Sequence, residues 1–166
     1  MQLTEHFKLE EFAVSHDYPE LARKIKFSRE DITKLFYISQ AILESARQVW
    51  DKIIIITSGK RTLELNKAIG GAPHSDHLFR KYSCAVDFTM EKKEELFEVY
   101  KFIMRQCYFL VGEMIIYFDK EWTPRFIHLS LPTPKHHHQF FYDYNYGKEF
   151  RPIYDLSSYI FYKLHG

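Results

Sequence analysis

Residues 53–72 read IIIITSGKRTLELNKAIGGA, and the fold is organised around the first part of this stretch. Four successive isoleucines predict a buried strand over 53–56, because β-branched side chains favour extended backbone and the run has no polar residue to face solvent. We expect this strand to end at the small polar sequence Thr57-Ser58-Gly59. Arg61 follows at once, and on its own it could be no more than a surface charge after a turn.

Helices are predicted on both sides of this strand. Ser28 is a favourable N-cap, and the acidic and then helically spaced apolar residues after it predict a helix over 28–50. A second helix is expected over 92–105. Strands over 113–118 and 125–131 are joined by a short connector that contains proline, which favours an antiparallel hairpin. This order of elements predicts an α+β domain.

Composition and charge exclude several classes of protein. The 166 residues suit one domain, and the net charge of +1 argues against a nucleic-acid partner. The longest aliphatic run, 53–56, is far shorter than the ~20 residues that span a bilayer. The first residues show no secretory signal, and two cysteines cannot form a disulfide framework. Nine histidines favour metal chemistry without showing which of them bind.

Three side chains in separate segments have the donor types of a metal site. Asp87 stands between Val86 and Phe88, and a carboxylate in an apolar strand is costly unless a charge or a metal pairs it. His77 and His128 add two imidazoles, although a single histidine in a strand is more often a packed core residue than a ligand. Together the three form the ligand set of a catalytic zinc, which lowers the pKa of a bound water to roughly 7 and polarises a carbonyl.

Three motifs occur together in this chain. They are the segment 55–72, the segment 75–87, which has Ser-x-His at its start and Ala-x-Asp at its end, and the strand 126–130, which reads FIHLS. Together they resemble the zinc D-Ala-D-Ala peptidase family, which cuts peptidoglycan peptides and includes VanX-like dipeptidases and phage endolysins. The resemblance covers residues 3–131. It implies a single-domain α+β fold of hedgehog type, with helices packed on a small, largely antiparallel sheet.

The resemblance also assigns roles to individual residues. It implies one zinc ion with two histidines and one aspartate as its ligands: His77, Asp87 and His128. Arg61 would contact a carbonyl or carboxylate of the substrate and stabilise negative charge in the transition state. Ser75 and Asn66 would also contact the substrate.

The loop between the first two ligands departs from the family pattern. Nine residues separate His77 from Asp87, three more than the family has, and Ser83 stands where the motif has glycine. Residues 78–82 therefore form an enlarged loop. Because a loop insertion costs little entropy and need not move either end, we expect the ligand geometry to survive and the wall of the cleft to differ.

The general base is the second departure. Arg125 stands where several family members have glutamate three residues before the last histidine ligand. The candidates to replace it are three carboxylates: Glu113, Asp119 and Glu121. A hairpin closed symmetrically pairs Phe118 with Arg125 and Ile115 with His128, which puts Glu113 on the face of His128. A one-residue slip would reverse that, so Glu113 is favoured and the others stay open.

The C-terminal part lies beyond the resemblance. We assign residues 1–135 to the peptidase-like domain and 136–166 to an aromatic-rich extension packed on it. A wall-binding patch and a subunit interface are the alternatives for this extension. The histidine run 136–138 is expected to be a solvated loop. His74, three residues before His77, is a minor candidate for lining the metal site. Three side chains of the extension are expected to point inward: Tyr154, Ile160 and Phe161.

These observations lead to one functional expectation and one alternative. The expectation is a zinc-dependent carboxypeptidase or endopeptidase acting on peptidoglycan stem peptides, with no nucleic-acid partner and no membrane span. Without a signal peptide, it would be made in the cytoplasm and reach the wall by lysis, by another delivery route or in a virion. The alternative is a catalytically inactive, zinc-stabilised binding or structural module on the same fold, motivated by the missing carboxylate and the altered loop. Oligomeric state is left open.

Overall fold

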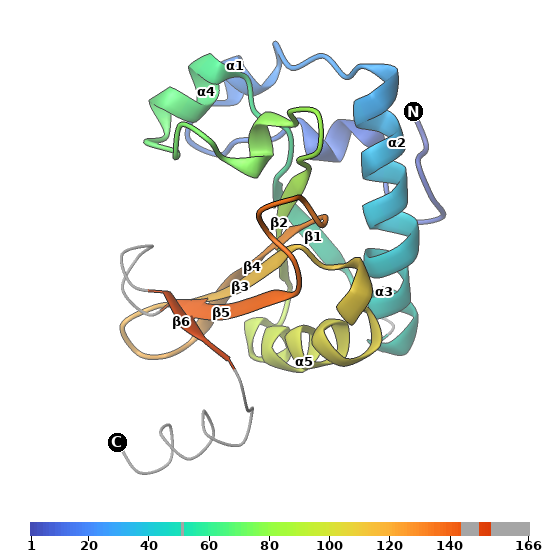
Figure 1. Cartoon of the computed structure of the whole chain (residues 1–166), viewed down its shortest axis with the longest axis vertical. Coiled ribbons are helices and arrows are strands. Elements are labelled where there is room, and N and C mark those ends of the chain that lie inside the picture. Colours follow the sequence, from blue (N-terminus) through green and yellow to red (C-terminus); the bar gives the residue numbers. More distant parts are fainter. Residues whose placement is uncertain (51, 144–149, 154–166) are drawn as a thin grey trace.

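The computed structural model describes residues 1–50, 52–143 and 150–153, and its centre is one mixed sheet with the strand order β1-β2-β4-β3-β5-β6 (Figure 1). Neighbouring strands are antiparallel except β3 and β5, which are parallel. The expected α+β class with a largely antiparallel sheet is therefore confirmed. The strands are β1 (Ile54–Ser58), β2 (Ala85–Met90), β3 (Glu113–Phe118), β4 (Pro124–Ser130), β5 (Gln139–Asp143) and β6 (Phe150–Pro152).

The two helices predicted over 28–50 and 92–105 are present, whereas α4 (Leu63–Ala68) was not predicted. The helix predicted over 28–50 consists of two α-helical parts joined by a π-helical turn at Ser39–Leu43. The α-helices are α1 (Pro19–Ala22), α2 (Arg29–Ile38), α3 (Glu44–Trp50), α4 (Leu63–Ala68) and α5 (Leu96–Gln106). Short 3-10 turns include η3 (Asp76–Leu78) and η5 (Tyr108–Leu110). In the part of the chain that the structure describes, no helix is long and apolar enough to cross a membrane.

The sheet buries one face against α2, α3 and α5 (Figure 1). Alternate residues of β2 and β4, among them Val86, Phe88, Ile127 and Leu129, are fully buried in this core. Since side chains alternate between the two faces of a strand, Asp87 and His128 lie on the opposite face. The apolar alternation of β2 and β4 thus directs these two polar side chains away from the hydrophobic core.

β1 is an edge strand, which corrects one expectation. The isoleucine run is predicted to be buried, but Ile53 and Ile55 are 57% and 44% exposed, whereas Ile54 and Ile56 lie in the core. The reason is the strand order, because β1 has a neighbour on one side only and its second face is not covered by the helices. A bulge between Ile56 and Ser58 then shifts the register where the chain approaches Asp87.

The segment after residue 135 adds strands to the sheet. β5 pairs with β3 in parallel, and β6 pairs with β5. The hydroxyl of the buried Tyr100 in α5 lies within hydrogen-bond distance of the backbone of both β3 and β5, at Met114 O (3.3 Å) and Phe141 O (3.2 Å). The three side chains expected to point inward, Tyr154, Ile160 and Phe161, lie outside the described residues.

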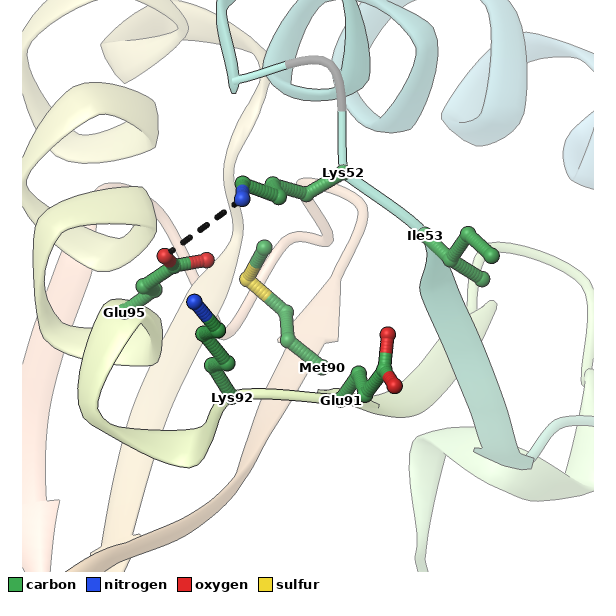
Figure 2. Close-up of a pocket in the computed structure, with 6 residues that line it drawn as sticks. All are labelled: Lys52, Ile53, Met90, Glu91, Lys92 and Glu95. Carbon is green, nitrogen blue, oxygen red and sulfur yellow. Dashed lines mark ion pairs between the residues drawn. The ribbon is translucent and has the colours of Figure 1, made fainter.

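A small pocket lies where β1 begins and β2 ends (Figure 2). It has about 230 Å³ of empty volume, part of it open to solvent. Lys52 and Lys92 are balanced in its lining by Glu91 and Glu95, and Lys52 Nζ lies 3.8 Å from Glu95 Oε1. Because Met90 is three residues along β2 from Asp87, this pocket lies about 10 Å away from Asp87 along the strand. It is therefore not part of the metal-ligand cluster described below.

Candidate metal centre

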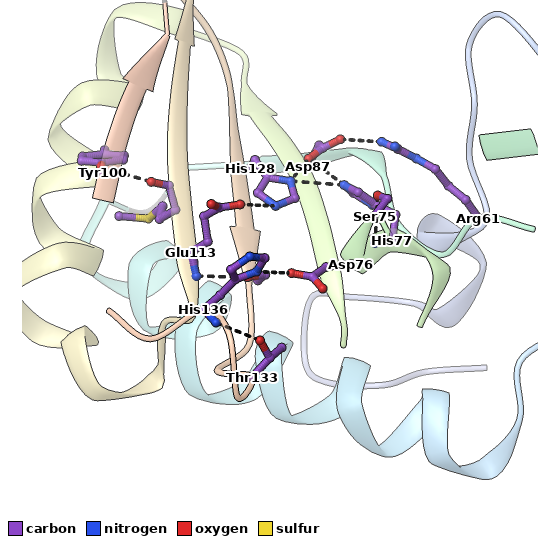
Figure 3. A network of polar contacts seen from close by, with 12 residues as sticks. Arg61, Ser75, Asp76, His77, Asp87, Tyr100, Glu113, His128, Thr133 and His136 are labelled. Carbon is purple, nitrogen blue, oxygen red and sulfur yellow. Dashed lines mark hydrogen bonds and ion pairs between the residues drawn. The ribbon is translucent and has the colours of Figure 1, made fainter. Parts of the chain in front are cut away.

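Three different elements bring His77, Asp87 and His128 together on the open face of the sheet (Figure 3). Asp87 in β2 is paired directly with His128 in the neighbouring β4. His77 comes from η3, the short turn that precedes the enlarged loop. Among the described residues this is the one group of three His, Cys, Asp or Glu side chains placed to hold a metal ion.

The donor atoms of the three side chains converge on one point. His128 Nδ1 lies 2.8 Å from Asp87 Oδ1, His77 Nε2 lies 3.1 Å from the same oxygen, and the two nitrogens are 3.2 Å apart. Zinc ligands at the usual ~2.0–2.1 Å in tetrahedral geometry are about 3.3 Å from one another. Two imidazoles and one carboxylate at this spacing fit zinc in both donor chemistry and separation.

The backbone around Gly59 fixes the orientation of the His77 ring. His77 Nδ1 is 2.7 Å from Gly59 O, and the backbone N–H of Arg61 donates to His77 O at 2.7 Å. The first contact orients Nε2 toward Asp87, as an outer-shell carbonyl does for a metal-binding histidine. A side chain at Gly59 would place Cβ 2.4 Å from Phe12 O. The glycine of the turn is therefore required by close backbone packing.

Charge and burial act in opposite directions on the three ligands. Burial alone would raise the pKa of Asp87, but the charge of His77 and the hydrogen bonds from His128 and His77 lower it far below its ordinary value. Burial lowers the pKa of His77. Burial would also lower the pKa of His128, but its hydrogen bond to Asp87 raises it. The ionised Asp87 is thus the charge that stabilises this buried group in the absence of metal.

Arg61 completes the polar cluster. Its Nη2 lies 3.0 Å from Asp87 Oδ2, and its Nε donates to Ser58 Oγ at 3.0 Å. Burial lowers the pKa of Arg61 and Asp87 opposes that effect, while an arginine stays charged throughout the physiological range. Because the guanidinium has five N–H groups, these two contacts leave donors for a further acceptor.

Of the three carboxylates considered as a general base, Glu113 lies nearest to the cluster. Glu113 Oε1 is 3.9 Å from His128 Nε2, and Ile115 pairs with His128 as expected. The end of the hairpin differs from the expectation, because Phe118 pairs with Pro124 across a register shift rather than with Arg125. Both other candidates, Asp119 and Glu121, lie in the turn after β3, where Asp119 Oδ1 accepts from two backbone N–H groups. That turn is about 13 Å along β4 from His128.

The remaining residues named from the motifs have local contacts. Ser75 caps η3, with its Oγ 3.3 Å from His77 N. Asn66 is buried in α4 and its Nδ2 donates to Ala72 O at 2.9 Å. His74 is exposed and lies 3.0 Å from the Arg80 guanidinium. These contacts place Ser75 beside a metal-ligand candidate and give Asn66 a role in holding the turn after α4.

The enlarged loop keeps both of its ends in place. Ser83 Oγ accepts from Arg80 N at 2.9 Å, which closes the tip of the loop as a tight turn. Phe79 has a positive φ of 49° and is buried, so it fixes the loop to the core. His77 and Asp87, on either side of this loop, are in contact, with His77 Nε2 3.1 Å from Asp87 Oδ1.

Some residues near the cluster were not found from the sequence. Tyr117 lies on the same face of β3 as Glu113, and burial, together with the charge of Asp87, raises its pKa. His136 Nδ1 lies 3.0 Å from Asp76 Oδ2, next to His77 (Figure 3). The expectation of a solvated loop at 136–138 is therefore wrong for His136, and also for His138, whose Nδ1 lies 2.9 Å from Tyr108 O. No pattern in the sequence links residues 60 positions apart, so nothing in the sequence indicated the contact between His136 and Asp76.

Comparison with known proteins agrees with this geometry. The family model Peptidase M15 matches residues 5–129, which is most of the chain and includes Arg61, the three metal-ligand candidates and Glu113. Comparison with curated proteins and with solved structures found no match. The chain therefore belongs to the Peptidase M15 family of zinc metallopeptidases.

Proposed function

We propose that this protein hydrolyses peptidoglycan stem peptides, as a D-Ala-D-Ala carboxypeptidase or as an endopeptidase, on a hedgehog-type fold. The observation that carries the proposal is the convergence of His77, Asp87 and His128, with donor atoms 2.8–3.2 Å apart, beside Arg61, whose side chain is largely shielded from solvent. These three residues would hold one zinc ion. When bound, zinc supplies a Lewis acid for the scissile carbonyl and an activated water.

Arg61 is proposed to bind the substrate oxygen on which negative charge develops. Its side chain is 13% exposed, so its charge acts where little water screens it. The contacts to Asp87 and Ser58 fix the guanidinium before substrate arrives. A donor that is positioned in advance stabilises the transition state without reorganisation, which is the usual basis of oxyanion stabilisation.

Glu113 is proposed to take up and return the proton during hydrolysis. It lies beside His128 with a side chain that is 22% exposed, whereas the other two candidates lie at the distant turn. The same position also allows a different role, in which Glu113 orients the His128 ring through Nε2. The two roles predict different results for Glu113→Gln, because an outer-shell residue acts on metal affinity and a base acts on turnover.

The test measures zinc content and release of D-Ala or peptide fragments from stem peptides. We expect one zinc per chain and measurable turnover in the unaltered protein. For Glu113→Gln we expect kcat to fall about 100- to 10,000-fold with zinc affinity unchanged. A fall of about 10- to 100-fold in zinc affinity would instead assign the orienting role. Glu121→Gln, the same substitution at the hairpin turn, is the matched control and should leave both quantities unchanged.

The alternative is a zinc-stabilised module without activity. It is favoured by Arg125, which stands where family members have glutamate. Stoichiometric zinc with no turnover on any stem peptide, and no effect of Glu113→Gln, would establish the module and refute the peptidase. The setting we propose for the active enzyme is cell-wall degradation in phage lysis or from a virion, and this part rests on the family resemblance alone.

A further inference from the structure

We propose that His136 contacts the substrate and forms, with Asp76, a wall of the peptide-binding site. This inference rests on the proposed peptidase function, which it extends by one residue. His136 lies beyond the residues 5–129 that match the family. It belongs to the loop 131–138, which connects β4 to β5 and passes the metal-ligand cluster.

The loop is anchored at both ends and within itself. Its first N–H, that of Leu131, donates to Cys84 O at 3.0 Å, directly before β2. Its last N–H, that of His138, donates to Val111 O at 3.0 Å, two residues before β3 begins. The buried Thr133 closes the tip, because its Oγ1 accepts from His136 N at 3.0 Å and its N–H donates to His136 O at 2.9 Å. The position of the His136 ring is therefore set by the fold.

Asp76 determines which nitrogen of His136 is available. Asp76 Oδ2 lies 3.0 Å from Nδ1, and the Asp76 side chain is 11% exposed. The His136 side chain is 34% exposed, and its Nε2 has no partner among the described residues. When a carboxylate holds one nitrogen of an imidazole, the other nitrogen is left for a second hydrogen bond. In the neutral ring this nitrogen accepts from an amide N–H, and in the protonated ring it donates to a carbonyl.

The placement of the ring points to the substrate side of the centre. Figure 3 shows His136 between Glu113 and Asp76, on the side of His128 where Glu113 lies. Independent backbone contacts agree, because Gln139 pairs with Glu113 and Ser130 Oγ accepts from Glu113 N at 3.0 Å. A peptide whose scissile bond reaches Glu113 would therefore pass His136. We assign its Nε2 a hydrogen bond to the peptide main chain.

The competing role for His136 is purely structural: the ring only holds the loop 131–138 to Asp76, a contact that we call the clip. Two substitutions separate the two roles. In His136→Asn the shorter amide can still donate to Asp76, so the clip is kept and the distal nitrogen is lost. In His136→Gln the longer amide can reach the position of Nε2, so the distal group is kept and the clip is weakened. A substrate contact predicts that Gln retains more activity than Asn, and a clip predicts the reverse.

The experiment uses the full chain loaded with zinc and a stem pentapeptide ending in D-Ala-D-Ala. For His136→Asn we expect kcat/KM to fall roughly 10- to 100-fold, mainly through KM, with zinc content and thermal unfolding unchanged. His137→Asn changes an exposed neighbour and should have no effect. Calorimetric titration of the pentapeptide into Glu113→Gln, with and without His136→Asn, reports binding without turnover and should show the same loss.

The outcomes distinguish this inference from the proposed function. Turnover by the unaltered protein together with unchanged KM and peptide affinity in His136→Asn would overturn the role of His136 and leave the peptidase standing. Absence of turnover in the unaltered protein would overturn the peptidase. In that case weaker peptide binding by His136→Asn supports the contact, and equal binding or no binding by either protein refutes it. If His136→Asn does not fold, His136→Ala is compared with His137→Ala: weaker peptide binding in the first variant alone supports the contact, and equal binding refutes it.

Discussion

Replacing Asp87 by asparagine tests how the polar cluster is held together. Asp87 Oδ1 lies 3.1 Å from His77 Nε2 and 2.8 Å from His128 Nδ1, and Asp87 Oδ2 accepts from Arg61 Nη2 (3.0 Å). An asparagine of the same shape has one acceptor oxygen, so its NH₂ group must face either the guanidinium or the two imidazoles. Removing one partner of a buried ion pair costs about 3–5 kcal/mol, because the remaining charge is buried without compensation.

We therefore expect Asp87→Asn to lower the free energy of unfolding of the metal-free protein by about 3 kcal/mol, which corresponds to about 6–12 °C in Tm for a chain of this size. Zinc at 100 times its Kd should stabilise the unaltered protein by a further amount of about 2.7 kcal/mol. The same zinc should add little to Asp87→Asn, because a ligand has been weakened. The gap between the two proteins then widens to about 6 kcal/mol.

The assay is urea unfolding of both proteins in EDTA and in excess zinc. Asp17→Asn is the matched control, since its carboxylate is 79% exposed and should change stability by less than about 0.5 kcal/mol. A loss below about 1 kcal/mol for Asp87→Asn in EDTA, close to that of the control, would refute the argument that Asp87 compensates buried charge. Equal stabilisation of both proteins by zinc would refute its role as a ligand.

Two further predictions concern the surroundings of the site. Burial would raise the pKa of Asp31, but its bond to Lys60 (2.6 Å) and the Ser28 cap lower it, so Asp31→Asn should cost about 1–3 kcal/mol at pH 7. The difference in free energy of unfolding between the two proteins should persist down to about pH 3.8 and disappear as the pH falls through the lower pKa that Asp31 has in the folded state. Urea unfolding from pH 7 to pH 2 measures this difference. An undiminished difference at pH 2 would contradict the argument. Gly59→Ala places Cβ against Phe12 O and should cost about 1–3 kcal/mol and weaken zinc binding. Unchanged Tm and zinc affinity would show that the turn relaxes freely.

Local patterns predicted the parts of the fold that depend on neighbouring residues. The apolar neighbours of Asp87 and the pattern of residues 125–131 indicated that Asp87 and His128 lie in strands, and the short connector of the hairpin placed Ile115 opposite His128. Both expectations hold because side-chain alternation and tight turns are local constraints. The bulge beside Phe118 was missed, because a single residue added to one strand leaves the hydrophobic pattern almost unchanged.

Contacts between distant segments could not be predicted in this way. The exposure of Ile53 and Ile55 depends on β1 being the edge of the sheet, which is a property of strand order. The contact between Asp76 and His136 depends on the return of the chain from β4 to β5. Pairing of β5 with β3 is parallel and non-local, and nothing in the residues after 135 indicates which strand they join.

Zinc stoichiometry is the most direct test of the central claim, that His77, Asp87 and His128 bind one zinc ion. Elemental analysis of the purified protein after dialysis should give one zinc per chain. His128→Ala should lose that zinc, whereas His137→Ala, which removes an exposed histidine, should keep it. Full zinc content in His128→Ala, or no bound zinc in the unaltered protein, would contradict the account.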